Sequence, residues 1–337
     1  MKQALAIFRF LRDCADRGER AALVTLTDVT GSAARAPGEH MAVSASGAAL
    51  GSFSGGCVEA AVIAEAQDAL AEGRARHVRY GVGSRYIDLR LPCGGGIDLL
   101  FTPTPDRRPI DQAIAVLEAR RPATLSLTID GAISAGAAGD ADRTAWHEDA
   151  FVVRHDPLLR LVIMGHGAEP PAMLDIARAY EAETLLLSPQ ASLVEDARQK
   201  GFAADLLRVL GRADGLAIDR WTAVVTLFHD HDWETALLLQ VLEDAPFFVG
   251  AMGSRRTQDE RLTRLVEAGG DPQALTRVVG PVGLIKATRD PRTLALSIMA
   301  QVVEAYETLT THRSPQPAAR SPQPATPGMK DAHAFIE

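Results

Sequence analysis

Two cysteines of this chain are each flanked by glycines, a combination that suits chemistry at a ligand. The first stretch reads SGGCVE and the second reads LPCGGG. Glycine lets a backbone approach a ligand closely, and free N–H groups at the start of a helix favour the thiolate of a cysteine there. The residues concerned are Gly55, Gly56 and Cys57 in the first stretch, and Cys93, Gly94 and Gly95 in the second.

The first stretch predicts a thiolate or anion site, although a tight turn with a buried cysteine would also explain it. The three glycines of the second stretch indicate close approach to a ligand or to another backbone. Acting together, Cys57 and Cys93 could contact a soft metal or a sulfur-bearing group, because thiolate is a soft ligand. They do not form a zinc site by themselves, since two ligands are too few and neither belongs to a CxxC pair. The remaining cysteine, Cys14, is expected to be a packing or surface thiol.

A glycine turn follows a strand-like run near residue 160. Gly165-His166-Gly167 comes between that run and a helical pattern, as in phosphate-binding and dinucleotide-binding loops. However, Pro170 replaces the third glycine, and the next strand ends in Ser188-Pro189-Gln190, without the carboxylate that would hold a ribose hydroxyl. We therefore expect Gly165 and Gly167 to bind phosphate and do not expect an NAD(P) site. A turn that binds nothing is the alternative.

Two further predicted strand ends carry polar residues. His229 lies in FHDHD, and Gly253-Ser254-Arg255 opens a helix after the run PFFVGAM. Ser254 suits the N-cap position, and an arginine such as Arg255 can bind phosphate oxygens in a bidentate way. The three loops would share the carboxyl edge of one parallel sheet and suit a phosphorylated, nucleotide-like ligand. Solvated loops and ordinary helix ends are the alternatives.

The elements that would position these residues differ between the two halves of the chain. The N-terminal half predicts a helix over 4–18, a strand over 21–30, a strand pair around 41–53, a helix ending at Gly73 and strands over 86–91 and 97–103. In the C-terminal half, strands over 160–165, 183–188, 222–228 and 246–252 are separated by helices, and a last helix covers about 290–311. This alternation is typical of a doubly wound parallel sheet.

The fold class predicted is therefore α/β, with an N-terminal α+β domain followed by a Rossmann-like, doubly wound parallel-sheet domain. We place the first domain at residues 1–105, a small β-rich connecting region at 106–157 and the Rossmann-like domain at 158–312. Residues 313–337 contain two SPQPA repeats and little apolar content, which predicts a flexible Pro-rich tail.

Composition excludes several classes of protein. The net charge is −8, with 43 acidic against 35 basic residues, whereas a nucleic-acid binder needs a basic stripe. No apolar run is long enough to span a membrane, and the first residues do not read as a secretory signal. The odd, low count of three cysteines, together with the lack of a secretory signal, favours a cytoplasmic protein with reduced thiols. No GxSxG, HExxH or P-loop motif appears, so hydrolase, metalloprotease and P-loop functions have no support.

In this order, the motifs resemble the XdhC/CoxI family of accessory proteins for xanthine dehydrogenase and related molybdenum hydroxylases. The N-terminal resemblance rests on GSA at 31–33, RAPG at 35–38, SGGCVE at 54–59 and CGGG at 93–96. The C-terminal resemblance rests on GHG at 165–167, HD at 229–230, GAMGSRR at 250–256, PVGL at 281–284 and SIMA at 297–300.

The resemblance implies a chaperone that binds molybdenum cofactor (molybdopterin) as cargo, protects it during sulfuration and inserts it into a hydroxylase. By analogy, Cys57 and Cys93 would face the molybdenum or sulfur end, and Gly165, Gly167, Ser254 and Arg255 the phosphate side. Expected partners are apo xanthine dehydrogenase or a related molybdenum hydroxylase, a cysteine desulfurase and a second copy of the chain. We expect no turnover by the protein itself. The alternative is an NAD(P)-dependent oxidoreductase using the Rossmann-like domain.

Overall fold

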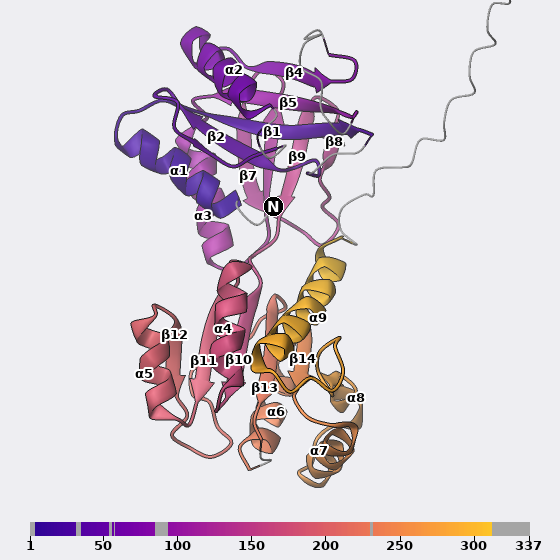
Figure 1. Cartoon of the computed structure of the whole chain (residues 1–337). Helices are drawn as coiled ribbons and strands as arrows, with labels where there is room; N and C mark the ends of the chain where they lie inside the picture. The colour runs from indigo at the N-terminus through magenta and orange to yellow at the C-terminus, as the bar shows by residue number, and fades with distance from the viewer. Residues whose placement is uncertain are drawn as a thin grey trace, which may run out of the picture.

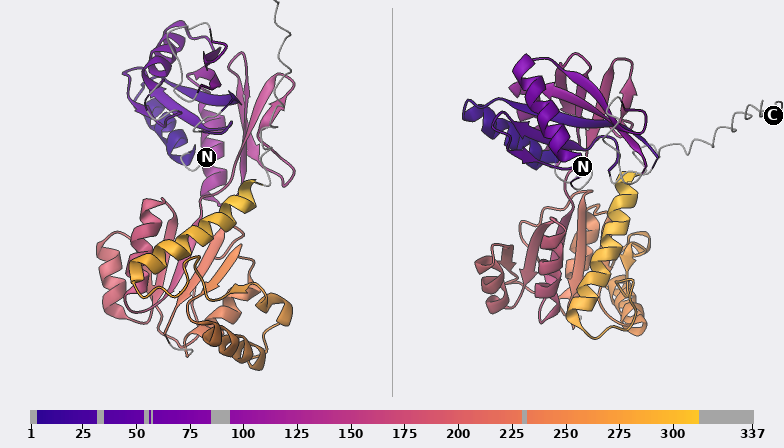
Figure 2. Two further views of the ribbon diagram at one scale, coloured as in Figure 1. Left: turned by 45° about the vertical axis from the view of Figure 1, so that its right-hand side comes forward. Right: turned by 45° about the horizontal axis from the view of Figure 1, so that its top comes forward.

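The computed structural model describes residues 4–31, 35–53, 56, 58–84, 94–229 and 232–311, which form two lobes (Figure 1). The upper lobe in that view ends with a strand that finishes at His155, and the lower lobe begins with a strand that starts at Arg160. Turned views show the last helix running along the lower lobe toward the upper one (Figure 2). Among the described residues, no helix combines the length and apolar character needed to cross a bilayer.

The upper lobe is built around a five-stranded antiparallel sheet with the strand order β3-β2-β1-β5-β4. The predicted strand over 86–91 lies outside the described residues, and β4 is a strand that the sequence pattern did not reveal. The elements are α1 (Ala4–Asp16), β1 (Ala21–Thr30), β2 (His40–Ser44), β3 (Ala49–Leu50), α2 (Glu59–Glu72), β4 (Arg76–Gly81) and β5 (Gly96–Pro103).

A second antiparallel sheet follows, with the order β7-β6-β9-β8. It falls in the stretch that the sequence marks as β-rich. Its elements are α3 (Arg107–Glu118), β6 (Ala123–Thr128), β7 (Ile133–Ala137), β8 (Ala145–His147) and β9 (Ala150–His155).

The first sheet is covered on both faces, which explains why β1 is buried from residue 21 to residue 27. Successive side chains of a strand point to opposite faces. Accordingly, Val24 packs into the core beneath α2, whereas Leu23 packs with α1, α3 and the second sheet. One continuous core thus joins residues on either side of position 105.

The lower lobe contains a six-stranded parallel sheet with the order β12-β11-β10-β13-β14-β15. In sequence order this is 3-2-1-4-5-6, the arrangement of doubly wound dinucleotide-binding folds. The predicted fold class is confirmed. The elements are β10 (Arg160–Gly165), α4 (Glu169–Ala179), β11 (Glu183–Ser188), α5 (Ala191–Gln199), β12 (Ala203–Leu206), β13 (Thr222–Leu227), α6 (Glu234–Glu243), β14 (Phe248–Ala251), α7 (Arg255–Glu267), α8 (Pro272–Leu275), β15 (Val278–Val279) and α9 (Pro291–Thr311).

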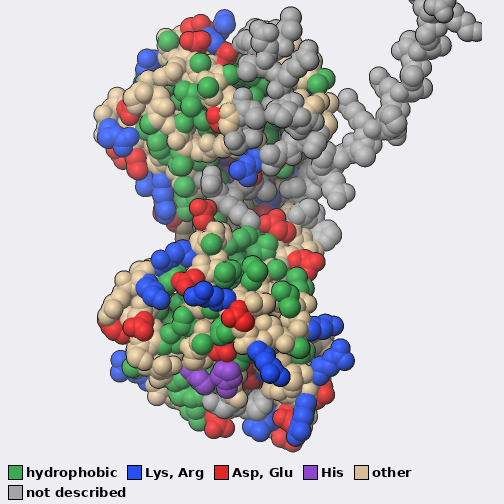
Figure 3. Space-filling view, viewed as in Figure 1, with side chains coloured by type: hydrophobic (Ala, Val, Ile, Leu, Met, Phe, Trp, Pro, Cys, Tyr) green, Lys and Arg blue, Asp and Glu red, His purple; other side chains and the backbone are tan. Residues whose placement is uncertain are grey.

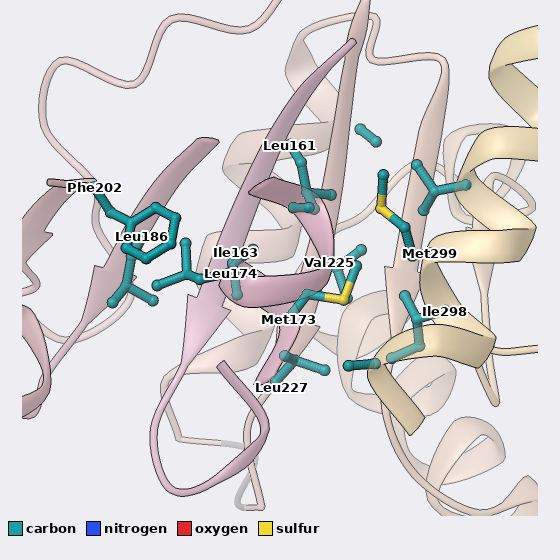
Figure 4. Packing of buried hydrophobic residues seen from close by; sticks show 14 of the residues in the cluster. Leu161, Ile163, Met173, Leu174, Leu186, Phe202, Val225, Leu227, Ile298 and Met299 are labelled. Carbon is teal, nitrogen blue, oxygen red and sulfur yellow. The ribbon is translucent and has the colours of Figure 1, made fainter. Parts of the chain in front are cut away.

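The last helix completes the core of this lobe. Ile298 and Met299 of α9 pack toward Met173 of α4 and toward the strand residues Ile163 and Val225 (Figure 4). Burying an aliphatic side chain of this size contributes about 1.5–3 kcal/mol relative to leaving it exposed. Helix α9 therefore fixes the position of α4, whose first turn lies at the carboxyl edge of the sheet.

Arg120 links the two lobes. It follows α3, and its guanidinium donates to Asp219 at 2.5 Å and to Glu183 at 2.6 Å, both in the lower lobe. Arg160 donates to the same Glu183 at 2.6 Å, and the Tyr306 hydroxyl donates to the carbonyl of Pro157 at 2.6 Å. The Arg120 contacts join the two lobes, whereas the other two lie within the lower lobe or between it and the connecting segment.

Candidate functional site

Three glycine-containing segments of the upper lobe approach one another at one end of the first sheet. Thr30 pairs with Gly96 between β1 and β5, and a Cβ added to Gly31 would lie 3.3 Å from the Cα of Gly95. Arg35 donates to the carbonyl of Ser52 at 3.2 Å, which joins the loop after β1 to the segment before α2. The described residues that flank the two predicted stretches therefore belong to one region of the fold.

The cysteines at the centre of the prediction fall outside the part of the chain that the structure describes. Cys57, Cys93 and Gly55 lie there, whereas Gly56, Gly94 and Gly95 are described. Among the described glycines of the two cysteine-containing stretches, Gly56 and Gly94 are exposed, and they adopt φ values of 127° and 66°. Both values lie in the region that L side chains rarely adopt, so these positions require glycine. The meeting of the two thiols stays a prediction.

Glu59 organises the described residues around Cys57. Its carboxylate accepts the N–H of Gly56 at 2.7 Å, of Phe53 at 3.1 Å and of Val58 at 3.2 Å, and the hydroxyl of Ser52 at 2.7 Å. The N-cap residue of α2, Val58, has no side chain that can cap the helix, and Glu59 supplies acceptors in its place. Its negative charge also offsets the positive end of the α2 dipole.

Arg79 anchors the segment around Gly96. Its guanidinium donates to Asp98 at 2.6 Å, to the hydroxyl of Thr30 at 2.9 Å and to the carbonyl of Val82 at 2.7 Å. A Cβ on Gly96 would come within 2.8 Å of this guanidinium. The third glycine of CGGG is thus required by packing, and this role of Arg79 was not recognised from the sequence. An arginine two residues before the end of a strand gave no distinctive signal.

In the lower lobe, the strand order reverses between the parallel neighbours β10 and β13, and ligands bind at such a point in open α/β sheets. A Cβ on Gly165 would lie 2.5 Å from the carbonyl oxygen of Leu227, so this glycine is required by the neighbouring strand. Gly167 has a φ of 90°. The ring of His229 lies 5.8 Å from that of His166, and these are the described histidines of the lower lobe, coloured purple in Figure 3.

The loop after β14 confirms the predicted helix start. Ser254 is the N-cap of α7, and its hydroxyl accepts the N–H of Thr257 at 3.1 Å. Arg256 pairs with Glu260 at 2.8 Å. Arg255 is exposed and forms no ion pair with the described residues, so its guanidinium is available to an anion.

A buried ion pair lies behind these loops and was missed by the sequence analysis. Arg261 of α7 donates to Glu234 of α6 at 2.8 Å and to the carbonyl of Met252 at 2.5 Å. Glu234 also accepts the hydroxyl of Thr226 at 2.6 Å, and the side chains of the ion pair are each 1% exposed. The pair connects the ends of β13 and β14 to the two helices that follow them.

A cavity also opens at this edge of the sheet. A cavity of about 440 Å³ lies at the carboxyl ends of β11 and β12 and is lined by Arg198, Arg208 and Arg212 among others. Within the described residues, no group of three or more His, Cys, Asp or Glu side chains is placed to hold a metal ion.

Taken together, the strand order and the glycine loops define a two-lobed α/β protein with a Rossmann-type domain at its C-terminal side. A family model described as the XdhC Rossmann domain matches residues 161–302, and one described as the XdhC and CoxI family matches residues 14–81. The molybdenum cofactor insertion chaperone PaoD of Escherichia coli (strain K12) is 36% identical over 298 residues, covering 88% of this chain and 86% of PaoD. The chain belongs to the XdhC and CoxI family, as its motifs predicted.

A solved structure has the same fold. The crystal structure of a protein from Bacillus halodurans, described as a xanthine dehydrogenase, matches with a TM-score of 0.71. The match covers 94% of this chain and 98% of that chain at 22% identity. At this level of identity the likeness concerns the fold.

Proposed function

We propose that this protein is a cytoplasmic chaperone that binds molybdenum cofactor, protects it during sulfuration and inserts it into xanthine dehydrogenase or a related molybdenum hydroxylase. The observation that carries the proposal is the 36% identity to PaoD, a molybdenum cofactor insertion chaperone, over 88% of the chain. The protein acts without turnover of its own. A cysteine desulfurase supplies the sulfur, and the chaperone works as a homodimer.

The upper lobe holds the molybdenum end of the cargo. Cys57 and Cys93 act as soft ligands there, because thiolates suit molybdenum and sulfur. The described residues around them fit this role, since Gly56 and Gly94 leave backbone exposed and Glu59 and Arg79 anchor the adjoining segments. Gly55 and Gly95 complete the two loops.

The lower lobe holds the organic part of the cargo at the carboxyl edge of its sheet. Gly165, Gly167 and His229 line the point where the strand order reverses. The phosphate lies against Gly253, Ser254 and Arg255, where free N–H groups begin α7 and an exposed guanidinium is available. NAD(P) is not the ligand, since β11 ends at Ser188 and Gln190 follows as the N-cap of α5, and neither side chain is the carboxylate that holds a ribose.

The direct test is anaerobic incubation of the purified protein with molybdenum cofactor, followed by gel filtration and molybdenum analysis of the protein peak. We expect molybdenum to coelute with the protein, and the loaded protein to activate an apo-hydroxylase. Coelution of the hydroxylase with a protein that retains no cofactor would identify a scaffold. Tight NAD(P) binding with hydride transfer would identify the oxidoreductase instead.

A further inference from the structure

A carboxylate stands where dinucleotide-binding folds place a phosphate. Glu169 is the first residue of α4 and follows the Gly-His-Gly turn after β10. Its Oε2 lies 3.3 Å from Nε2 of His229, and its side chain is 16% exposed. Within the described part of the chain, Glu169 has no other hydrogen bond or ion pair, so most of its capacity to accept hydrogen bonds is unused.

This carboxylate disfavours an anion at the turn. It repels a phosphate, and it already occupies the positive end of the α4 dipole. A Cβ on Gly167 would lie 3.3 Å from Oε2 of Glu169 and 3.7 Å from Nε2 of His229. Glycine at 167 therefore leaves one side of the Glu169–His229 pair uncovered, and the ligand group that fits there is an N–H donor.

We propose that Glu169 binds the 2-amino-4-oxopyrimidine edge of the cargo's pterin, an inference that rests on the proposed function. This edge presents an amino group and a neighbouring ring N–H side by side, and a carboxylate accepts both in two parallel, charge-assisted hydrogen bonds. The rings of His166 and His229, with centroids 5.8 Å apart, offer flat surfaces to a bicyclic ring, and the buried ring of Phe228 packs against that of His166. The pterin edge thus replaces the phosphate predicted at Gly165 and Gly167, and the phosphate binds at Ser254 and Arg255.

Free pterin, which is fluorescent, is a probe that needs no molybdenum. We expect saturable binding to the wild-type protein and binding at least about tenfold weaker to Glu169→Gln, since an amide replaces one acceptor by a donor and removes the charge. Asp175→Asn is the matched control, because Asp175 lies exposed on the same helix, and it should bind pterin as the wild type does. Circular dichroism confirms that both variants are folded.

Three results would overturn the inference: no saturable binding of pterin to the wild type, equal binding by Glu169→Gln, or an equal loss in Asp175→Asn. Guanine carries the same edge, so guanosine monophosphate is the second probe. Tighter binding of this nucleotide than of pterin, with the same dependence on Glu169, would assign the site to a guanine nucleotide and reject the pterin.

Molybdenum retention separates this inference from the proposed function. A wild-type protein that retains molybdenum cofactor, together with a Glu169→Gln variant that retains it equally well, rejects the role of Glu169 and leaves the chaperone intact. A wild-type protein that binds free pterin through Glu169 but retains no molybdenum cofactor rejects the chaperone and keeps the pterin site.

Discussion

The glycine-containing loops of the two lobes are held in different ways. In the upper lobe they lie at the end of an antiparallel sheet, and two partly exposed charged groups, Glu59 and Arg79, tie neighbouring segments together through several hydrogen bonds. In the lower lobe they follow parallel strands, and a fully buried ion pair between Arg261 and Glu234 supports them from behind. Partly exposed hydrogen bonds thus hold the glycine loops of the upper lobe, whereas a buried ion pair supports those of the lower lobe.

This difference predicts that removing a single charge lowers the unfolding free energy more in the lower lobe than in the upper one. Arg261→Met removes the cation that neutralises the buried Glu234, which should cost about 3–5 kcal/mol of unfolding free energy. Urea denaturation followed by circular dichroism measures this loss. The double variant Arg261→Met with Glu234→Leu should recover most of it, because an apolar pair replaces the charges.

Arg79→Met is the matched test in the upper lobe. The side chains of Arg79 and Asp98 are 28% and 15% exposed, so Asp98 keeps access to water and the loss of unfolding free energy should be smaller than for Arg261→Met. A larger loss of unfolding free energy in Arg79→Met than in Arg261→Met would show that the upper lobe depends more on a single charge than the lower lobe does.

The second-largest expected effect is a pH dependence that arises in the upper lobe. His40 and His155 are buried, and their Nε2 atoms lie 3.2 Å apart. Burial lowers the pKa of His40 to about 3, and burial followed by the neighbouring His40 lowers the pKa of His155. Both histidines bind a proton more readily in the unfolded chain, so stability is full above about pH 6.5 and falls below it, by about 1.4 kcal/mol per pH unit for each.

Urea denaturation at pH 7.5, 6.0 and 5.0 measures this slope. His155→Phe should flatten it relative to the wild type, because one of the two buried titrating groups is removed. A wild-type protein whose unfolding free energy is the same at pH 7.5 and pH 5.0 would show that the two histidines are not buried as a neutral pair.

A smaller effect is expected at Glu59. Glu59→Gln retains one acceptor oxygen but places an amino group among the N–H donors of Phe53, Gly56 and Val58. Retention of molybdenum cofactor should fall about tenfold, equivalent to losing one charge-assisted hydrogen bond. Glu72→Gln, at the other end of the same helix, serves as the control. Unchanged retention in Glu59→Gln would separate the ordering of this loop from cargo binding.

The smallest effect is expected at the start of α7. Ser254→Ala removes the acceptor for the N–H of Thr257 and should cost about 1 kcal/mol of unfolding free energy. Thermal or urea denaturation measures it, and Ser254→Asp should preserve the cap. A loss of several kcal/mol would mean that Ser254 supports more than the first turn of the helix.

Much of the fold could be predicted because its determinants are local. The apolar runs at 160–165 and 222–227 and the helices between them report a parallel sheet directly. Gly73 ends α2 in the left-handed conformation, as its position predicted. By contrast, β4 reads RHVRYG, in which charged residues conceal the alternation, and it becomes a strand by pairing with β5.

The candidate site was less predictable because its partners are distant in sequence. Arg79 meets Thr30, and Arg261 meets Glu234 and Met252, through tertiary contacts that no local pattern reports. The sequence places Glu169 in the loop GHGAEP, and its contact is with His229, sixty residues later. The glycine motifs can be recognised in the sequence, whereas the charged residues that anchor these loops are identified only from the fold.

The central claim is that the two glycine-flanked cysteines hold the cargo, and molybdenum retention by single variants tests it most directly. Cys14→Ala is the matched control, since Cys14 is fully buried in the core and burial raises the pKa of its thiol. We expect Cys57→Ala and Cys93→Ala each to lose most of the molybdenum that the wild type carries through gel filtration, and Cys14→Ala to keep it. Full retention by both Cys57→Ala and Cys93→Ala would show that these cysteines do not hold the cargo.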